Sequence, residues 1–267
     1  MPYLYKSPAK VNLFLNILRK RKDGYHDIQS IFQLIDLQDE IIFKKRNDCR
    51  INLKCNLKSL EQDNLIIKAI NIYSKISKIE NIGLDVTLKK NIPIGSGLGG
   101  GSSNAATTLL ALNEIYDHKV KLPSLYKAAL SIGSDVPFFL NEKNSWVEGK
   151  GDIITSIFLK PAWFIMIFGK YNVSTSDIYQ LFDIPSEPVD YSYDNYMSND
   201  FKNDFENVVF HKYPSIKASY DILSSLGDAR MSGTGGTTFV SFDTFESAKA
   251  AISIIPKNQK AVLVSSL

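Results

Sequence analysis

The chain has 267 residues and a formal net charge of +3, and 44% of its residues are hydrophobic and 22% charged. This composition allows a full hydrophobic core and excludes a disordered or collagen-like chain. The small net charge gives no indication of nucleic-acid binding, and two cysteines are too few for a disulfide framework. The three histidines lie far apart and lack the spacing of metal ligands.

The apolar stretches do not indicate secretion or membrane insertion. The N-terminal sequence MPYLYKSPAKVNLFL lacks the charged start and apolar block of a signal peptide. The most apolar later stretch, PAWFIMIFG, is about half as long as a membrane helix requires. We therefore expect a cytoplasmic protein, monomeric or weakly dimeric, with neither a membrane nor a nucleic acid as its partner.

Strands dominate the elements predicted for the first half of the chain. Residues 10–37 form two apolar stretches joined at Asp23–Gly24, a dipeptide suited to the positive φ of a hairpin turn. The apolar stripe of residues 64–77 predicts a helix, with Asp63 or Asn64 as its N-cap. Further short strands are predicted over 39–45, 49–55 and 84–90.

Helices and strands alternate in the remainder of the chain. The predicted elements are helices over 102–116 and 122–133, a strand over 163–169, helices over 174–182, 203–211 and 213–226, a strand over 237–242, a helix over 245–255 and a strand over 260–265. The acidic, Ser-, Asn- and Tyr-rich stretch 185–200 is expected to be a surface loop. This order predicts an α+β chain with two domains that join near residues 155–160.

The glycine-rich stretch PIGSGLGGGSSNAAT, residues 93–107, is the most informative local feature. A flexible linker does not fit, because a helical pattern starts at Ser102 and apolar residues flank the glycines. A P-loop, G-x-x-x-x-G-K-[ST], would align on Gly95, Gly100 and Ser102, but Gly101 stands in place of its lysine. Without that charge the P-loop interpretation is poor.

The dinucleotide-binding pattern G-x-G-x-x-G is present at Gly95, Gly97 and Gly100. Its mechanism requires a strand that ends at the first glycine and an acidic residue on a second strand about 20 residues later. The predicted strand ends too early, and Glu114 and Asp117 fall at the end of a helix. An oxidoreductase is therefore the second-ranked interpretation of the pattern.

The remaining interpretation is a glycine loop that leads into the N-terminus of a helix, with Ser102, Ser103 and Asn104 in its first turn. Backbone N–H groups and the positive end of the helix dipole can bind an anion there without a lysine. The pattern therefore predicts a phosphate site, but it does not select ATP.

PIGSGLGGGSSNAAT resembles the phosphate loop of the GHMP kinases, the superfamily of galactokinase, homoserine kinase, mevalonate kinase and phosphomevalonate kinase. Further motifs resemble one branch of the superfamily, in the same order, between residue 6 and about residue 243: SPAKVNLFLNILRKRKDGYHDIQSIFQLIDLQD, GSDVPFFL, EGKGD, NDFENVV and MSGTGGTTF. The resemblance implies an N-terminal domain over 1–157 like domain 2 of ribosomal protein S5, and a ferredoxin-like α/β sandwich over 158–267.

The resemblance also implies the reaction: ATP, with Mg²⁺ expected, phosphorylates a hydroxyl group of a small molecule that carries cytidine diphosphate. Lys10, in P-A-K, and Asp135, in G-S-D-V-P, are the implied catalytic pair. A carboxylate can deprotonate the alcohol, and a nearby ammonium keeps that carboxylate ionised and offsets developing charge. Another small-molecule kinase of the superfamily, or a non-catalytic ligand-binding relative, is the alternative.

The remaining site residues follow from the same resemblance. Tyr25 and His26 are implied to hold cytosine, one by stacking and one by hydrogen bonding, and Tyr179 stands where the family commonly has Phe. The other implied substrate positions are Asn12, Thr175 and Gly235. The implied ATP positions are Asn64, Lys90, Pro93, Gly95, Gly97, Leu98, Gly99, Gly100, Gly101, Ser102 and Ser103. Ser103 is a candidate Mg²⁺ contact, and no carboxylate ligand is evident.

Overall fold

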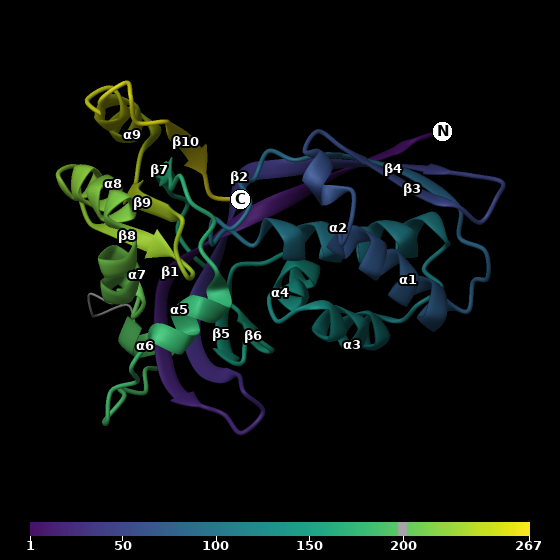
Figure 1. Cartoon of the computed structure of the whole chain (residues 1–267), viewed down its shortest axis with the longest axis horizontal. Helices are drawn as coiled ribbons and strands as arrows, with labels where there is room; N and C mark the ends of the chain where they lie inside the picture. Colours follow the sequence, from purple (N-terminus) through teal and green to yellow (C-terminus); the bar gives the residue numbers. More distant parts are fainter. Residues whose placement is uncertain (197–201) are drawn as a thin grey trace. The chain divides into compact units, whose positions relative to one another are not determined.

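The structure is a computed structural model of the whole chain, and it describes residues 1–196 and 202–267 (Figure 1). The chain forms two compact units. Unit 1 comprises residues 1–9, 37–92 and 99–142, and unit 2 comprises residues 10–36, 93–98 and 143–267. Strands β1 (Tyr3–Lys20) and β2 (His26–Lys45) contribute residues to both units, so each unit is built from separate stretches of the chain. The domain bounds 1–157 and 158–267 stay a prediction.

Unit 1 combines a small sheet with four helices, α1 (Leu65–Ser77), α2 (Gly100–Ile115), α3 (Leu122–Ile132) and α4 (Val136–Asn141). Strand β4 (Leu84–Lys89) pairs antiparallel with the second half of β2 and parallel with β3 (Ile51–Cys55). A 3₁₀ turn, η1 (Lys58–Leu60), follows β3. Figure 1 shows the four helices together on one side of β3 and β4, where α1 and α2 pack on each other, α3 packs against α1, and α4 packs against α2.

Local signals in the sequence explain where the helices of unit 1 begin and end. Asn64 is the N-cap of α1, and its Oδ1 accepts a hydrogen bond from Ile66 N at 2.9 Å. Helix α3 has Pro123 in its first turn and ends just before Gly133, as predicted. Helix α4 was not predicted, because VPFFLN is short and its first five residues are all buried, which leaves no periodic polar face.

Unit 2 contains residues 10–20 of β1 and 26–36 of β2, which continue as a pair, together with two further sheet regions. Strand β5 (Ser145–Gly149) pairs antiparallel with β2 and with β6 (Ile153–Ser156). The second sheet has the antiparallel order β10-β7-β9-β8, formed by Ala261–Ser265, Trp163–Phe168, Thr237–Phe242 and Ala229–Ser232 respectively. The helices of unit 2 are α5 (Thr175–Leu181), α6 (Tyr193–Tyr196), α7 (Glu206–Lys212), α8 (Pro214–Ser224) and α9 (Phe245–Ile252).

Two sequence predictions need correction. Residues 39–45 are not a separate strand but the continuation of β2, which is 20 residues long. The predicted loop 185–200 contains the short helix α6, and its residues 197–200 lie outside the described part of the chain. Part of this stretch is anchored, because Tyr191 N donates to Gln29 Oε1 at 2.9 Å and Gln29 Nε2 donates to Asp190 Oδ1 at 2.8 Å.

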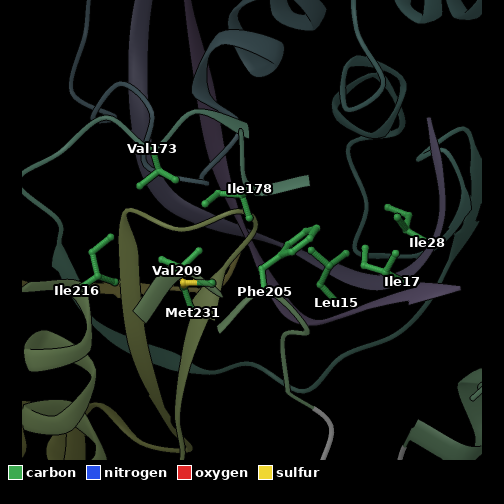
Figure 2. Packing of buried hydrophobic residues seen from close by; sticks show 9 residues of the cluster. All are labelled: Leu15, Ile17, Ile28, Val173, Ile178, Phe205, Val209, Ile216 and Met231. Atoms are coloured by element: carbon green, nitrogen blue, oxygen red, sulfur yellow. The ribbon is translucent and has the colours of Figure 1, made fainter. Parts of the chain in front are cut away.

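A hydrophobic cluster joins both sheet regions of unit 2 (Figure 2). Phe205, directly before α7, is fully buried in it, and Figure 2 shows its ring beside Leu15 of β1. The other buried members are Ile17, Ile28, Val173, Ile178, Val209, Ile216 and Met231. The cluster therefore ties the first hairpin to α5, α7, α8 and β8. None of the described helices combines the length and apolarity needed to span a membrane.

Candidate active site

The backbone of the glycine-rich loop adopts a conformation, and a close approach to a second backbone segment, that a side chain would not allow. Gly97 has a φ of +76°, and a Cβ built on it would lie 2.2 Å from Ser232 O and 2.9 Å from Gly235 O. The loop residues 93–98 and the glycine turn 233–236 thus approach each other backbone to backbone inside unit 2. Gly99, with a φ of +70°, is the N-cap of α2 in unit 1. Only glycine adopts these conformations without strain, which explains the density of glycines.

Helix α2 starts with backbone donors and no negative charge. Its first four residues, GGSS, contain no acidic side chain, and Gly99 has no side chain to act as a cap. The first N–H groups of a helix lack partners inside the helix, and the dipole is positive at that end. The start of α2 is therefore compatible with an anion, and phosphate binding there stays a prediction.

A buried polar network supports the start of α2 from inside unit 1. The fully buried Asp39 accepts hydrogen bonds from Asn91 N at 2.7 Å and Ile92 N at 2.8 Å, and it pairs with the ammonium of Lys90. Asn104 Nδ2 in α2 also donates to Asp39, at 2.9 Å. Sequence reasoning missed Asp39, because an acidic residue in a strand gives no sign of burial.

The same network contains the hydroxyl group of Ser103. Asn104 Nδ2 donates to Ser7 Oγ at 2.9 Å, and the hydroxyls of Ser7 and Ser103 share a hydrogen bond of 2.8 Å. Ser103 is fully buried. Its hydroxyl is thus already engaged in the interior, and its expected contact with Mg²⁺ stays a prediction.

Lys90 and Asn64, both predicted ATP positions, have structural partners in unit 1. The Lys90 side chain is only 5% exposed, and burial lowers the pKa of its ammonium while Asp39 opposes that change. Its Nζ lies beneath Gly100, where a Cβ would approach it to 2.7 Å. Asn64 uses Oδ1 as the N-cap of α1 and donates through Nδ2 to Leu60 O at 2.8 Å. Contacts of these two residues with ATP remain predictions.

Lys10 is a buried cation rather than a solvated strand residue. It is 3% exposed, its ammonium donates to Asn12 Oδ1, and its Nζ lies 4.4 Å from the centroid of the Phe32 ring. Its backbone N donates to Leu98 O at 3.1 Å, which ties β1 to the glycine-rich loop within unit 2. Asn12 is itself held, since its Nδ2 donates to Ser30 Oγ at 2.9 Å.

Asp135 lies in unit 1, at the N-cap position of α4. It is half-buried, and Ser134 Oγ lies 3.5 Å from its Oδ1. Lys10 belongs to unit 2, so the pairing of these two residues stays a prediction. Asp135 lies within a turn, because Val136 N donates to Gly133 O at 3.3 Å directly before the buried α4.

The predicted substrate residues all belong to unit 2, and the structure brings several together. The rings of His26 and Tyr179 have centroids 4.8 Å apart, and burial, with a smaller effect of Lys20, lowers the pKa of His26. Tyr25, at the hairpin turn, is 53% exposed, and Lys150 Nζ lies 5.1 Å from its ring centroid. A neutral imidazole and an exposed aromatic face are both suited to contact with a base.

The last two substrate positions meet at the glycine turn. The hydroxyls of Thr175, the first residue of α5, and Thr234 share a hydrogen bond of 3.0 Å. Gly235 follows Thr234 with a φ of +105°. Thr234 was not singled out from the sequence, although it lies within MSGTGGTTF.

Two family models match this chain. The GHMP kinases N terminal domain matches residues 64–143, and the GHMP kinases C terminal model matches residues 191–261. The first match contains the glycine-rich loop and helices α1, α2, α3 and α4, and the second contains α7, α8 and the glycine turn.

Relatives of known name cover nearly the whole chain. The chain is 40% identical over 238 residues to a 4-diphosphocytidyl-2-C-methyl-D-erythritol kinase of Francisella tularensis subsp. novicida, covering 88% of this chain and 86% of that protein. It is 38% identical to the kinase of the same name from Buchnera aphidicola subsp. Acyrthosiphon pisum, covering 100% of this chain and 96% of that protein.

Solved structures of kinases share the fold of this chain. A crystal structure of 4-(cytidine 5'-diphospho)-2C-methyl-D-erythritol kinase superposes with a TM-score of 0.85 at 27% identity, over 100% of this chain and 99% of that one. The Methanococcus jannaschii mevalonate kinase, at 17% identity and a TM-score of 0.71, covers 100% of this chain and 98% of its own and shares the fold. The chain therefore belongs to the GHMP kinases, and within them to the family of the 4-diphosphocytidyl-2-C-methyl-D-erythritol kinases.

Proposed function

We propose that this chain transfers the γ-phosphate of ATP to the 2-hydroxyl group of 4-diphosphocytidyl-2-C-methyl-D-erythritol, giving the 2-phosphate and ADP, in the non-mevalonate route to isoprenoid precursors. The acceptor is thus an alcohol group. The observation that carries the proposal is the match to kinases of that name along nearly the whole chain. The backbone anion site at the start of α2 and the buried cation Lys10 support it.

In the proposed reaction, the carboxylate of Asp135 accepts the proton of the substrate hydroxyl group. The hydroxyl oxygen then forms a bond to the γ-phosphorus as the bond to the β,γ-bridging oxygen breaks, and ADP leaves. The ammonium of Lys10 would keep Asp135 ionised and offset charge on the transferring group. The hydrogen bond to Asn12 and the Phe32 ring hold Lys10 in one position for that role.

Mg²⁺ is part of this proposal as an ion that accompanies ATP. Among residues 1–196 and 202–267, no three His, Cys, Asp or Glu side chains are grouped so that they could hold a metal ion. Magnesium commonly takes its ligands from substrate phosphates and water, and it neutralises phosphate charge. The backbone donors at the start of α2 would orient the same phosphates.

A coupled ADP-release assay tests the substrate. With ATP and Mg²⁺, we expect turnover of 4-diphosphocytidyl-2-C-methyl-D-erythritol and none above background with mevalonate, homoserine or galactose. Turnover of one of those three in place of the cytidine diphosphate compound would identify a different kinase of the superfamily. Binding of the compound in isothermal titration without ADP release would indicate a non-catalytic relative.

Replacing Tyr25 by alanine is expected to weaken binding and leave the chemical step intact. Stacking of a base on an aromatic ring contributes about 1–3 kcal/mol, so we expect KM for the cytidine diphosphate substrate to rise about 5- to 150-fold. The kcat value and the KM for ATP should stay within about twofold, because stacking stabilises the bound substrate and the transition state equally. Tyr25→Phe keeps the ring and is the matched control. An unchanged KM in Tyr25→Ala would contradict stacking.

A further inference from the structure

The motif NDFENVV begins with Asn203–Glu206, a segment for which the proposed reaction provides no role. It lies in unit 2 and ends at Glu206, the first residue of α7, and its Phe205 lies in the hydrophobic cluster of Figure 2. Its polar residues are buried as well, since Asn203 is 4% and Glu206 6% exposed. Burying polar groups costs free energy unless they are hydrogen-bonded, so their partners indicate what the segment holds.

On one side, the segment holds β1. Asp204 N donates to Leu15 O at 2.9 Å, and Leu15 N donates to Lys202 O at 3.3 Å. Asp204 Oδ2 accepts a further hydrogen bond from Ile17 N at 2.7 Å. The two backbone bonds form an isolated parallel bridge between Leu15 and Asn203, and together with the side-chain bond they hold the part of β1 that follows Lys10.

On the other side, the segment holds β8 and the turn that follows it. Asn203 Nδ2 donates to Met231 O at 2.9 Å and to Gly233 O at 2.6 Å. Glu206 Oε1 accepts from Met231 N at 3.0 Å. Both backbone groups of Met231 are therefore anchored by side chains of one segment.

The residue between these anchors connects the predicted substrate and phosphate positions. Ser232 Oγ accepts a hydrogen bond from Asn12 N at 3.2 Å and donates to Gly97 O at 3.0 Å. Ser232 is fully buried, so a shift of Met231 would move its hydroxyl and the glycine turn together.

We propose that Glu206 is a positioning residue for phosphoryl transfer, acting through the Met231 N–H group on Ser232 and on the turn Gly233–Gly236. The inference rests on the proposed kinase activity. Glu206 accepts the hydrogen bond of the Met231 N–H group near the end of β8. A hydrogen bond from an N–H group to a carboxylate is about twice as strong as one to a neutral oxygen. The ionised form should therefore fix the turn more firmly than the neutral form.

The charge of Glu206 changes near neutral pH. Burial raises the pKa of Glu206 to about 7, while the Met231 N–H group, Lys202 and Arg230 oppose the rise and Asp228 adds to it. We therefore expect kcat/KM for the cytidine diphosphate substrate to fall as the pH falls through about 7, because protonation replaces a charge-assisted hydrogen bond with a neutral one.

Unfolding should respond to pH in the opposite direction. Glu206 has an ordinary pKa of 4.5 and a pKa of about 7 in the fold, so the folded protein binds this proton more tightly than the unfolded chain. The stability that this proton provides is fully present below pH 4.5 and is lost as the pH rises through 7. A purely structural residue would change activity and stability in the same direction.

The variant Glu206→Gln separates the two effects, because it keeps an acceptor oxygen and removes the charge. At pH 8 we expect kcat/KM for the cytidine diphosphate substrate to fall about three- to fivefold, with an unfolding midpoint at or above that of the unchanged protein. At pH 6 the two proteins should have equal kcat/KM. The exposed Glu246, replaced by Gln, is the matched control and should follow the unchanged protein throughout.

Hydrogen exchange at the Met231 amide tests the positioning role independently of turnover. Its protection at pH 8 should fall in Glu206→Gln and stay unchanged in Glu246→Gln. Unchanged protection, or equal pH profiles of kcat/KM for Glu206→Gln and the unchanged protein, would overturn the role of Glu206. Lost protection in a protein that never phosphorylates the compound would support the anchoring and contradict the proposed substrate.

Discussion

Asp135→Asn is expected to lower kcat by about a hundredfold to ten-thousandfold, the range that general acid–base groups contribute. Asparagine keeps the shape of the side chain but cannot accept the hydroxyl proton. The unfolding midpoint should change little, because the Asp135 side chain makes no capping hydrogen bond to α4 and asparagine has nearly the same size. Steady-state kinetics and thermal unfolding of the purified variant check both expectations.

Asp117→Asn is the matched control for this experiment. Asp117 is an exposed residue of unit 1 with a φ of +56°, a conformation that asparagine adopts equally well. We expect full activity and an unchanged midpoint. Near-normal turnover of Asp135→Asn would reject the base assignment and leave Asp135 as the residue that starts α4.

Gly97→Ala is expected to have the largest effect on the fold of the site. The new Cβ would lie 2.2 Å from Ser232 O, and alanine is strained at a φ of +76°. We expect a loss of about 2–3 kcal/mol in the free energy of unfolding, or roughly 5–10 °C in the unfolding midpoint. The KM for ATP should rise as well, because the loop and the glycine turn must separate.

Gly101→Ala is the matched control for the stability measurement alone, because a Cβ there would meet Leu65 Cδ1 at an ordinary 3.5 Å, whereas Gly101 is itself a predicted ATP position. Gly101 lies in the first turn of α2, so alanine should leave the unfolding midpoint unchanged or slightly higher. If Gly97→Ala unfolds like the unchanged protein and retains its KM for ATP, the close backbone approach at Gly97 is refuted.

The sequence predicts most of the fold, because its elements carry local signals. Helix α1 has a stripe and an N-cap, α3 has its proline and glycine, and the first hairpin has Asp23–Gly24 at its turn. Helix α4 lacks a polar face, and β5 and β6 are short, so none of the three has a periodic pattern in the sequence. The extent of β2 was also missed, since polar residues between its apolar stretches suggested a break.

The candidate site is predictable where motifs mark it and hidden where burial decides. The glycine loop and the rings of His26 and Tyr179 follow from motifs. The burial of Lys10 and the ion pair of Asp39 with Lys90 depend on contacts between segments far apart in the chain. Glu206 lies in a recognisable motif, yet its partner Met231 is 25 residues away.

The backbone of the glycine loop also limits where mutations could cause resistance to an inhibitor. The loop offers backbone groups, and at Gly97 a side chain of any kind meets Ser232 O. A substitution at Gly97 introduces a clash and does not change the chemistry of the backbone N–H groups. An inhibitor that binds only to these backbone groups can therefore be affected by few substitutions that the protein tolerates. Tyr25 is half-exposed and makes its contacts through a side chain, so many replacements fit. We expect resistance to an inhibitor that spans both regions to arise at Tyr25 before it arises in the loop.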